Sequence, residues 1–394
     1  MPLLRRTEAT GDIAMRIVFD GRAVVNQLDG TARYSLNLIS QISRSLPDTS
    51  FIVLIREDLK REMRDLLPER AVLREMPFRH ISPKTVFLMG SFVDEMQADL
   101  FHSPFMLQPL FMKTPGIITI HDAMWWKHPW FQAKEEPLRM AVGWLYYRTL
   151  VRLCVSQTRR MITVSEATKT DVAESWPHAI PKLRVVAGGV EDCFKPASDP
   201  ARTARLLEDL GVEDKAYFLH VTNGRPYKNT LALLRAFATI APHSDQRMLI
   251  VGNLGRFRTR VVDTIKELRI EDRTKVLGSV TDEQVIGLMQ SALALAFPSL
   301  FEGFGLPVLE SMACGCPVLT SNRGSLAEVA GDDALIVDPT SIDSMAEGLL
   351  KLTRDPQLRE SLKLRGLSRA SHFTWSEAAR SIIKIYQEVL EEST

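Results

Sequence analysis

The sequence predicts an α/β protein made of two domains, each with a parallel β-sheet. Short apolar runs rich in β-branched residues alternate with amphipathic helical patterns, which is typical of βαβ units. The chain has 394 residues, too many for one ordinary hydrophobic core. The alternation also stops near residue 200 and then starts again, which indicates that a second α/β domain begins there.

The first domain is predicted to span residues 15–198. Its strands are expected at 16–20, 50–55, 99–103, 116–122 and 160–165, where the apolar runs lie. Between the first two, an apolar residue recurs at every fourth position from Tyr34 to Leu46, the stripe that one face of a helix buries. Residues 1–14 are polar and aperiodic, so they are expected to form a flexible lead before Met15 opens the first strand.

The second domain is predicted to span residues 199–374, after a Pro-, Ala- and Ser-rich linker at 195–203. Its strands are expected at 216–222, 247–252, 275–280, 293–299, 317–321 and 334–339. Residues 375–394 then form an amphipathic helix, which is expected to pack back towards the first domain. Its apolar side is predicted to carry Ile382, Ile383, Tyr386 and Leu390.

Composition excludes several classes of protein. The 49 Lys and Arg residues nearly balance the 48 Asp and Glu residues, so there is no bulk positive field of the kind that binds nucleic acid. The four cysteines show no CxxC spacing, which argues against a zinc site or a disulfide framework, and Cys314 and Cys316 are expected to be small buried residues. No apolar run is long enough for a signal peptide or a membrane span, so a cytoplasmic protein is expected.

Polar side chains follow two of the predicted strands, where open parallel sheets bind their ligands. His121 and Asp122 come directly after the strand at 116–120, although Asp122 also suits a helix cap and His121 a buried core position. Arg225 and Lys228 lie in the turn "GRPYKN" after a later strand. Their side chains suit a diphosphate, whereas the alternative is a solvated charged turn.

Glycines near predicted helix starts point to an anion site. Gly30 opens the first helix, where free N–H groups and the helix dipole favour a negative charge. No GxxxxGK[ST] motif occurs, and "GFGLPV" lacks the third glycine of the dinucleotide fingerprint. The sequence therefore argues against P-loop and dinucleotide cofactor sites.

Two glutamates, Glu302 and Glu310, lie in "FEGFGLPVLESMACGCPV". Pro307 suits the first turn of a helix, which makes Glu302 a loop residue and places Glu310 in the helix. Eight helical steps would separate the two by roughly 12 Å, more than the about 5 to 9.5 Å between glycosidase carboxylates. A hydrolytic pair is therefore disfavoured. Glu310 suits either favourable placement near the positive helix end or a vicinal diol such as a ribose.

These residues resemble the family 4 glycosyltransferases, from Met15 to the final helix. The most specific element is the E-x7-E signature formed by Glu302 and Glu310. The segments "GTARY", "IHD", "ITVSEATKTDV", "AGGVEDCFKP" and "GRPYKN" match in the family's order. Two positions depart from the family pattern: Gly188 replaces a common asparagine, and Asp29 replaces a glycine or serine beside Gly30.

The resemblance implies the GT-B fold, in which an acceptor-side domain and a nucleotide-sugar domain, both Rossmann-like, face each other across a cleft. It also implies a retaining transferase that needs no metal or other cofactor. Arg225 and Lys228 would hold the diphosphate, Glu310 the ribose and Glu302 the donor sugar, while His121 would face that sugar and Asp122 the acceptor. The remaining donor contacts implied are Gly30, Val280, Gly303, Phe304, Gly305 and Leu306.

The donor and the acceptor are less constrained. The context of "IHD" and "HPWF" resembles mannosyltransferases of surface polysaccharide synthesis, which makes GDP-mannose the first choice and a UDP-sugar the next. The acceptor is expected to be a glycan or a lipid-linked saccharide. Residues 137–160 mix aromatics with Arg139, Arg148, Arg152, Arg159 and Arg160, so they fit either an anionic membrane surface or a helix half buried on the sheet.

Two other functions use the same residues. A GT-B epimerase or hydrolase of sugar nucleotides would need no acceptor, and a non-catalytic sensor would bind the donor without turnover.

Overall fold

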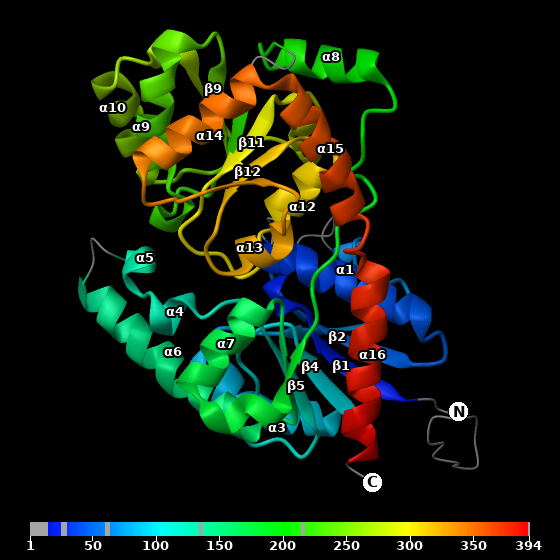
Figure 1. The fold of residues 1–394 in the computed structure, drawn as a ribbon. Helices are drawn as coiled ribbons and strands as arrows, with labels where there is room; N and C mark the ends of the chain where they lie inside the picture. The colour runs from blue at the N-terminus through cyan, green and yellow to red at the C-terminus, as the bar shows by residue number, and fades with distance from the viewer. Residues whose placement is uncertain (1–14, 25–29, 60–63, 134–136, 214–216, 393–394) are drawn as a thin grey trace. The chain divides into compact units, whose positions relative to one another are not determined.

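The computed structural model describes residues 15–24, 30–59, 64–133, 137–213 and 217–392. The lead predicted at residues 1–14 lies outside this part of the chain. The chain forms two compact units (Figure 1). The first comprises residues 1–129, 133–189 and 374–394, and the second comprises residues 130–132 and 190–373.

The units meet in the chain at Gly189 and Val190, earlier than the boundary predicted at residues 198 and 199. Hydrogen bonds explain the difference. The Val190 N–H donates to the Phe373 carbonyl (2.9 Å), and the Gln290 amide donates to the Lys195 carbonyl (2.8 Å), so the chain is already tied into the second unit here. The polar composition of 195–203 thus marks a surface segment of the second unit, in which helix α8 begins at Pro200.

A seven-stranded parallel sheet forms the centre of the first unit, in the order β3-β2-β1-β4-β5-β6-β7. All five predicted strands are present. The strands are β1 (Arg16–Asp20), β2 (Ser50–Arg56), β3 (Val72–Met76), β4 (Leu100–Ser103), β5 (Gly116–Ile120), β6 (Arg160–Thr163) and β7 (Leu183–Val185). The two strands that the sequence did not predict, β3 and β7, are the edges. Edge strands lack the continuous apolar run of a strand buried on both faces, and β3 buries only Met76.

Helices cover this sheet, and the last one is fixed by a buried polar contact. The helices are α1 (Gly30–Ser45), α3 (Pro83–Glu95), α4 (Met124–Lys127), α6 (Pro137–Gln157), α7 (Glu166–Ser175) and α16 (Trp375–Glu391), while most of the short helix α5 (Trp130–Ala133) belongs to the second unit. Helix α16 packs beside α1 (Figure 1). Its Tyr386 hydroxyl lies 2.6 Å from Nδ1 of His102 on β4, whose Nε2 lies 3.1 Å from the Thr119 hydroxyl. Burial lowers the pKa of His102 to about 3, so this ring is neutral.

The apolar face of α16 differs in part from the prediction. Ile382 and Tyr386 are buried as expected, but Ile383 and Leu390 are only half-buried. The buried stripe recurs at helical spacing and continues through Ile385 and Val389 instead.

The second unit has a six-stranded parallel sheet in the order β10-β9-β8-β11-β12-β13, and all six strands were predicted. They are β8 (Tyr217–Val221), β9 (Arg247–Val251), β10 (Thr274–Gly278), β11 (Ala294–Phe297), β12 (Val318–Ser321) and β13 (Leu335–Val337). The helices are α8 (Pro200–Asp209), α9 (Thr230–Ile240), α10 (Phe257–Glu267), α11 (Asp282–Ser291), α12 (Leu306–Ala313), α13 (Ser325–Ala330), α14 (Ile342–Arg354) and α15 (Pro356–Ala370). Two parallel-sheet units of this kind confirm the predicted α/β class.

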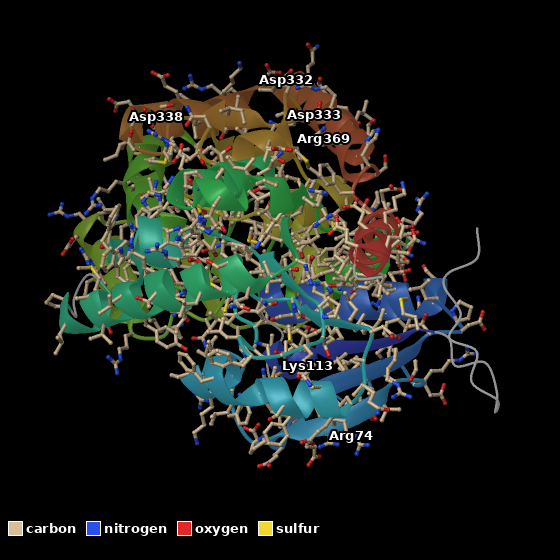
Figure 2. All side chains as sticks on the ribbon, turned by 90° about the horizontal axis from the view of Figure 1, so that it is seen from below. Arg74, Lys113, Asp332, Asp333, Asp338 and Arg369 are labelled. Atoms are coloured by element: carbon tan, nitrogen blue, oxygen red, sulfur yellow. The ribbon has the colours of Figure 1, made fainter. Side chains whose placement is uncertain are left out.

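The surface and the cysteines agree with the composition. Exposed charges of both signs occur, for example Arg74 and Lys113 on the first unit and Asp332 on the second (Figure 2). Cys314 and Cys316 are buried, as predicted, and burial raises the pKa of the Cys316 thiol to about 12. Among the described residues, no helix combines the length and apolar character that crossing a membrane requires.

Candidate active site

The second unit gathers most of the predicted site residues at the carboxyl ends of its central strands. The strand order reverses between β8 and β11, and ligands of open α/β sheets bind at such a reversal. Arg225 and Lys228 follow β8, while Glu302 follows β11. The two groups therefore flank the reversal point, which is where the topology favours a ligand.

A short 3-10 helix, Pro226–Lys228, ends at Lys228, and Arg225 is the residue directly before it. Arg225 is exposed, whereas Lys228 is buried. The Lys228 ammonium lies 2.7 Å from Oε1 of Glu302, and the side chains of the pair are 10% and 12% exposed. It also lies 4.5 Å from the centre of the Phe297 ring, a cation–π distance. The solvated-turn interpretation is therefore wrong for Lys228.

A buried ion pair of this kind is weak evidence for stability, because removing both charges from water is costly. Two well-packed apolar residues would often stabilise the same place at least as well. The gain in folding stability therefore does not by itself account for this pair.

His220 on β8 lies next to this loop, and no pattern in the sequence indicated its role. Its Nδ1–H donates to the Ala296 carbonyl on β11 (2.8 Å), because a carbonyl only accepts. Nε2 therefore accepts from the Thr230 hydroxyl at the start of α9 (2.9 Å). Burial, the largest cause, and the nearby Lys228 charge lower the pKa of His220 to about 4, although the hydrogen bond to Ala296 raises it. A neutral ring thus joins β8, β11 and α9 beneath Lys228.

The loop from Glu302 to Gly305 leads into α12, whose first turn contains Pro307 as predicted. Gly305 has φ 102°, and a Cβ there would lie 2.6 Å from Leu326, so glycine is required. No side chain caps the N-terminus of α12, so its positive dipole end favours an anion. Pro307 has no N–H, and the Val308 N–H donates to the Gly305 carbonyl (3.0 Å). The Ser325 hydroxyl donates to the Glu302 carbonyl (2.8 Å) and fixes the loop.

The other predicted donor contacts surround this loop or lie further along the sheet. Phe304 is buried, with its ring centre 6.0 Å from that of Phe373, so its backbone is the part left for a ligand. Leu306 opens α12, and Glu310 lies in the next turn of the helix and is half-buried. Val280 follows β10, the edge strand separated from β8 by β9.

Three predicted residues belong to the first unit. Nε2–H of His121 donates to the Pro104 carbonyl (2.9 Å), and the ring meets Tyr34 edge-on at 4.7 Å. Asp122 accepts the Met124 N–H (2.8 Å), the local cap-like bond that was its structural alternative. Gly30 begins α1, and among the described residues a Cβ there would meet no protein atom within 4 Å.

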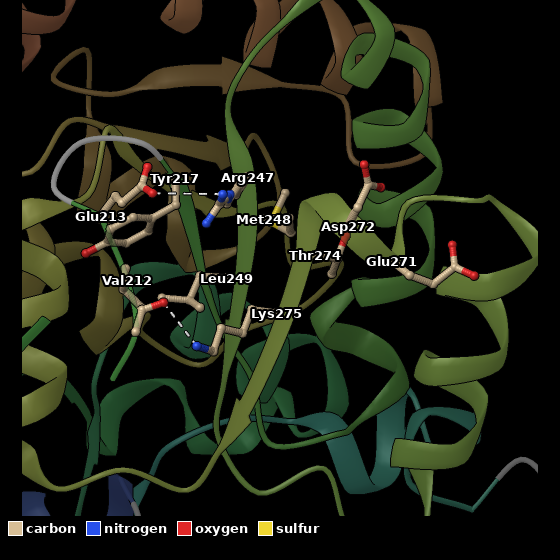
Figure 3. A pocket seen from close by; sticks show the side chains of 11 residues that line it. Val212, Glu213, Tyr217, Arg247, Met248, Leu249, Glu271, Asp272, Thr274 and Lys275 are labelled. Atoms are coloured by element: carbon tan, nitrogen blue, oxygen red, sulfur yellow. Dashed lines mark hydrogen bonds and ion pairs between the residues drawn. The ribbon is translucent and has the colours of Figure 1, made fainter. Parts of the chain in front are cut away.

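A cavity of about 230 Å³ lies at the opposite end of the second sheet (Figure 3). Its floor and walls include Tyr217, Arg247 and Thr274, which begin β8, β9 and β10. The Lys275 ammonium at its rim donates to the Leu210 and Gly211 carbonyls at the end of α8. The cavity lies at the amino ends of the strands, whereas ligands of open parallel sheets bind at the carboxyl ends. The Lys275 ammonium is already used to bind carbonyl groups at the end of α8.

Within the described part of the chain, no three His, Cys, Asp or Glu side chains lie close enough together to hold a metal ion.

Comparisons with known proteins agree on one family. Residues 205–369 match the family described as "Glycosyl transferases group 1". O-antigen chain mannosyltransferase B of Escherichia coli is 26% identical over 397 residues, which cover 95% of this chain and 100% of the relative. MMP alpha-(1->4)-mannosyltransferase of Mycolicibacterium hassiacum is 26% identical over 302 residues, covering 72% of this chain and 68% of the relative.

The fold has close structural neighbours as well. The crystal structure of HepE from Anabaena in complex with UDP-glucose superimposes with a TM-score of 0.76 and 18% identity, covering 95% of this chain and 100% of HepE. The family match at residues 205–369 in the second unit, the relative covered over its full length and the shared two-sheet fold agree on a glycosyltransferase with the GT-B fold.

Proposed function

We propose that the protein is a retaining hexosyltransferase that moves a sugar from a nucleoside diphosphate to a glycan or lipid-linked acceptor. GDP-mannose is the first choice of donor, because two of the relatives are mannosyltransferases. A UDP-sugar is the second, since the neighbour HepE was crystallised with UDP-glucose. The observation that carries the proposal is the buried Lys228–Glu302 pair beside the uncapped N-terminus of α12.

In this proposal the diphosphate of the donor displaces Glu302 from the Lys228 ammonium. Arg225 and the positive dipole end of α12 complete the anion site, and Glu310 accepts hydrogen bonds from the ribose diol. The released Glu302 carboxylate then accepts hydrogen bonds from the donor sugar. The ion pair holds both side chains in place before the donor arrives.

The chemical step follows from this arrangement. The bond between the anomeric carbon and the diphosphate oxygen breaks, and the acceptor oxygen bonds to the same face of the carbon. The acceptor's proton passes to the departing diphosphate oxygen, so no separate base is required. Lys228 and Arg225 stabilise the negative charge that grows on the leaving group. We propose that these cations serve in place of a metal ion.

A thermal-shift panel with GDP, UDP, ADP, CMP and TDP, each with and without EDTA, tests the proposal. A nucleotide at 100 times its dissociation constant should stabilise the protein by about 2.7 kcal/mol. One nucleotide should shift the melting temperature clearly and equally in EDTA. A shift that EDTA abolishes would contradict the metal-free site, and no shift with any nucleotide would contradict donor binding.

Two single variants separate binding from turnover. Glu310→Ala should raise the dissociation constant of the favoured nucleotide about tenfold or more, because hydrogen bonds to a charged group are worth about 1.5 to 3 kcal/mol. His121→Ala should instead lower kcat while nucleotide binding stays at the wild-type level. Calorimetry and steady-state kinetics measure the two quantities. Equal nucleotide binding by wild type and Glu310→Ala would overturn the ribose assignment.

The acceptor reaction is distinguished from its alternatives by omitting the acceptor. A transferase should release nucleoside diphosphate much faster with an acceptor than without one. Equal rates would favour hydrolysis or epimerisation, and binding without any turnover would favour a sensor.

We also propose that α6 rests on an anionic membrane that holds a lipid-linked acceptor. Leu138, Val142 and Leu145 are 78%, 60% and 60% exposed and share one side of the helix. Helix α6 contains Arg139, Arg148 and Arg152 but no acidic residue. Arg160, by contrast, forms ion pairs with Glu388 of α16 and with Glu392, which directly follows that helix, so it is not part of this proposal.

Vesicle sedimentation tests the membrane contact. Wild type should sediment at low salt with vesicles containing phosphatidylglycerol but not with pure phosphatidylcholine, because each arginine near an anionic surface contributes about 1 kcal/mol. Leu138→Gln/Leu145→Gln and Arg148→Gln/Arg152→Gln should each weaken sedimentation. Leu364→Gln, a change at an exposed leucine of α15, is the matched control. Absence of wild-type binding to both vesicles would end the idea.

A further inference from the structure

Asn229 has an unusual backbone conformation at the end of the loop that carries Lys228. Its φ of 61° and ψ of 25° lie in the left-handed region, which residues other than glycine rarely adopt. Among the described residues, only Gln97 and Arg269 are other non-glycine residues with positive φ. Asn229 directly follows Lys228 and precedes α9, so its conformation sets how the Lys228 loop enters that helix.

The Asn229 side chain does not cap α9, although asparagine is a preferred cap. Its amide instead donates to the Pro298 carbonyl (3.1 Å) and to the Pro339 carbonyl (2.7 Å). Both acceptors are carbonyl oxygens, so the NH₂ group must face them. One amide thus ties together the loops that follow β8, β11 and β13.

The two hydrogen bonds of the Asn229 amide hold the loops together independently of the ion pair. The backbone N–H of Leu300 donates to the Tyr227 carbonyl (2.7 Å), and Lys228 pairs with Glu302 (2.7 Å), so the same two loops meet at three points. In the proposed function the ion pair opens when the diphosphate binds Lys228. The bonds of Asn229 involve neither charged group and persist through that exchange.

We propose that Asn229 is a positioning residue for the donor site, which holds the Lys228 loop and the Glu302 loop in register while their ion pair opens. This inference rests on the proposed function for its catalytic consequence. Its structural part, that the amide sets the spacing of the two loops, stands independently.

Two variants and one control test the role. Asn229→Gly keeps a backbone that tolerates positive φ but removes the amide, and Asn229→Asp keeps the size while placing oxygens against two carbonyls. Arg269→Gly makes the same backbone change at an exposed position after α10, away from these loops. Asn229→Gly should lower kcat/KM for the donor about tenfold, since it removes two hydrogen bonds that position the site. Asn229→Asp should lower it further, and Arg269→Gly should leave it unchanged.

Hydrogen exchange separates this inference from the proposed function. Without any ligand, peptides covering residues 298–305 should exchange faster in Asn229→Gly than in wild type, and Arg269→Gly should match wild type. Faster exchange together with an enzyme that turns over no sugar nucleotide would leave the structural tie intact and contradict the proposed function. Unchanged exchange, or wild-type kcat/KM in an active Asn229→Gly enzyme, would overturn the positioning role.

Discussion

Lys228→Met should lower kcat/KM by about 10³-fold, because it removes a fixed positive charge from the place where charge develops on the leaving group. Methionine fills a similar volume, so the packing against Phe297 is largely kept. The Glu302 carboxylate, whose side chain is 12% exposed, loses its partner. Breaking such a buried pair should also destabilise the second unit by about 3 to 5 kcal/mol.

The double variant Lys228→Met/Glu302→Gln separates the two effects. It removes the unpaired charge, so most of the lost stability should return, while the activity should stay as low as in the single variant. Urea unfolding and donor kinetics measure the two quantities. Lys169→Met breaks an exposed pair with Glu166, 3.0 Å away, and serves as the control, with an expected loss below about 1 kcal/mol.

Either of two results would contradict this assignment. If Lys228→Met kept wild-type kcat/KM, the lysine would be structural and another group would bind the diphosphate. If the double variant recovered activity together with stability, the single variant would have failed through misfolding of the loop.

The fold was largely predictable from the sequence because most strands of both sheets are buried on both faces. Their apolar runs are therefore continuous and easy to recognise. The missed strands β3 and β7 lie at the edges, where the pattern weakens. The site was predictable only to the level of loops, since strand ends in a parallel sheet share one edge.

The contacts that shape the site depend on distant parts of the chain. Asn229 bonds carbonyls at residues 298 and 339, and His220 bonds a carbonyl at residue 296. No local pattern indicates such partners. The left-handed backbone of Asn229 was the one local hint available, since asparagine tolerates it better than most residues. The pairing of Lys228 with Glu302 was likewise not predicted, because each was assigned to the donor and not to the other.

The buried Asp20–Arg22 ion pair of the first unit is another contact that the sequence pattern did not indicate. The Arg22 side chain is fully buried, with Nε 2.8 Å and Nη2 2.7 Å from the two oxygens of Asp20. Its Nη1 donates to the Phe78 carbonyl and the Thr85 hydroxyl, both at 3.0 Å. Burial alone would raise the pKa of Asp20, but the charge and hydrogen bonds of Arg22 outweigh it and lower that pKa.

Arg22→Met should therefore destabilise the first unit by about 3 to 5 kcal/mol near neutral pH, because it leaves the Asp20 carboxylate buried without its partner. The loss should shrink as the pH falls. In the variant burial remains the largest influence, against the nearby His80 and the backbone N–H of residue 22, so the Asp20 pKa should rise. The carboxyl then regains a proton on acidification and recovers about 1.4 kcal/mol per pH unit below that raised pKa. In wild type the pKa is lowered, so the stabilisation is complete above the ordinary value of 3.8 and is lost only below it.

Urea unfolding at about pH 7.5 and about pH 5 measures the difference in unfolding free energy between wild type and Arg22→Met. This difference should be smaller at the lower pH, because the folded variant takes up a proton there. Titrating groups away from the pair, such as His102 and His220, affect both proteins alike and cancel in the difference. Asp20→Asn/Arg22→Met, which cannot take up that proton, should differ from wild type by the same amount at both pH values. A difference between Arg22→Met and wild type that stays constant with pH would show that Asp20 is not the group left unpaired, and that Arg22 stabilises the end of β1 through Phe78 and Thr85 instead.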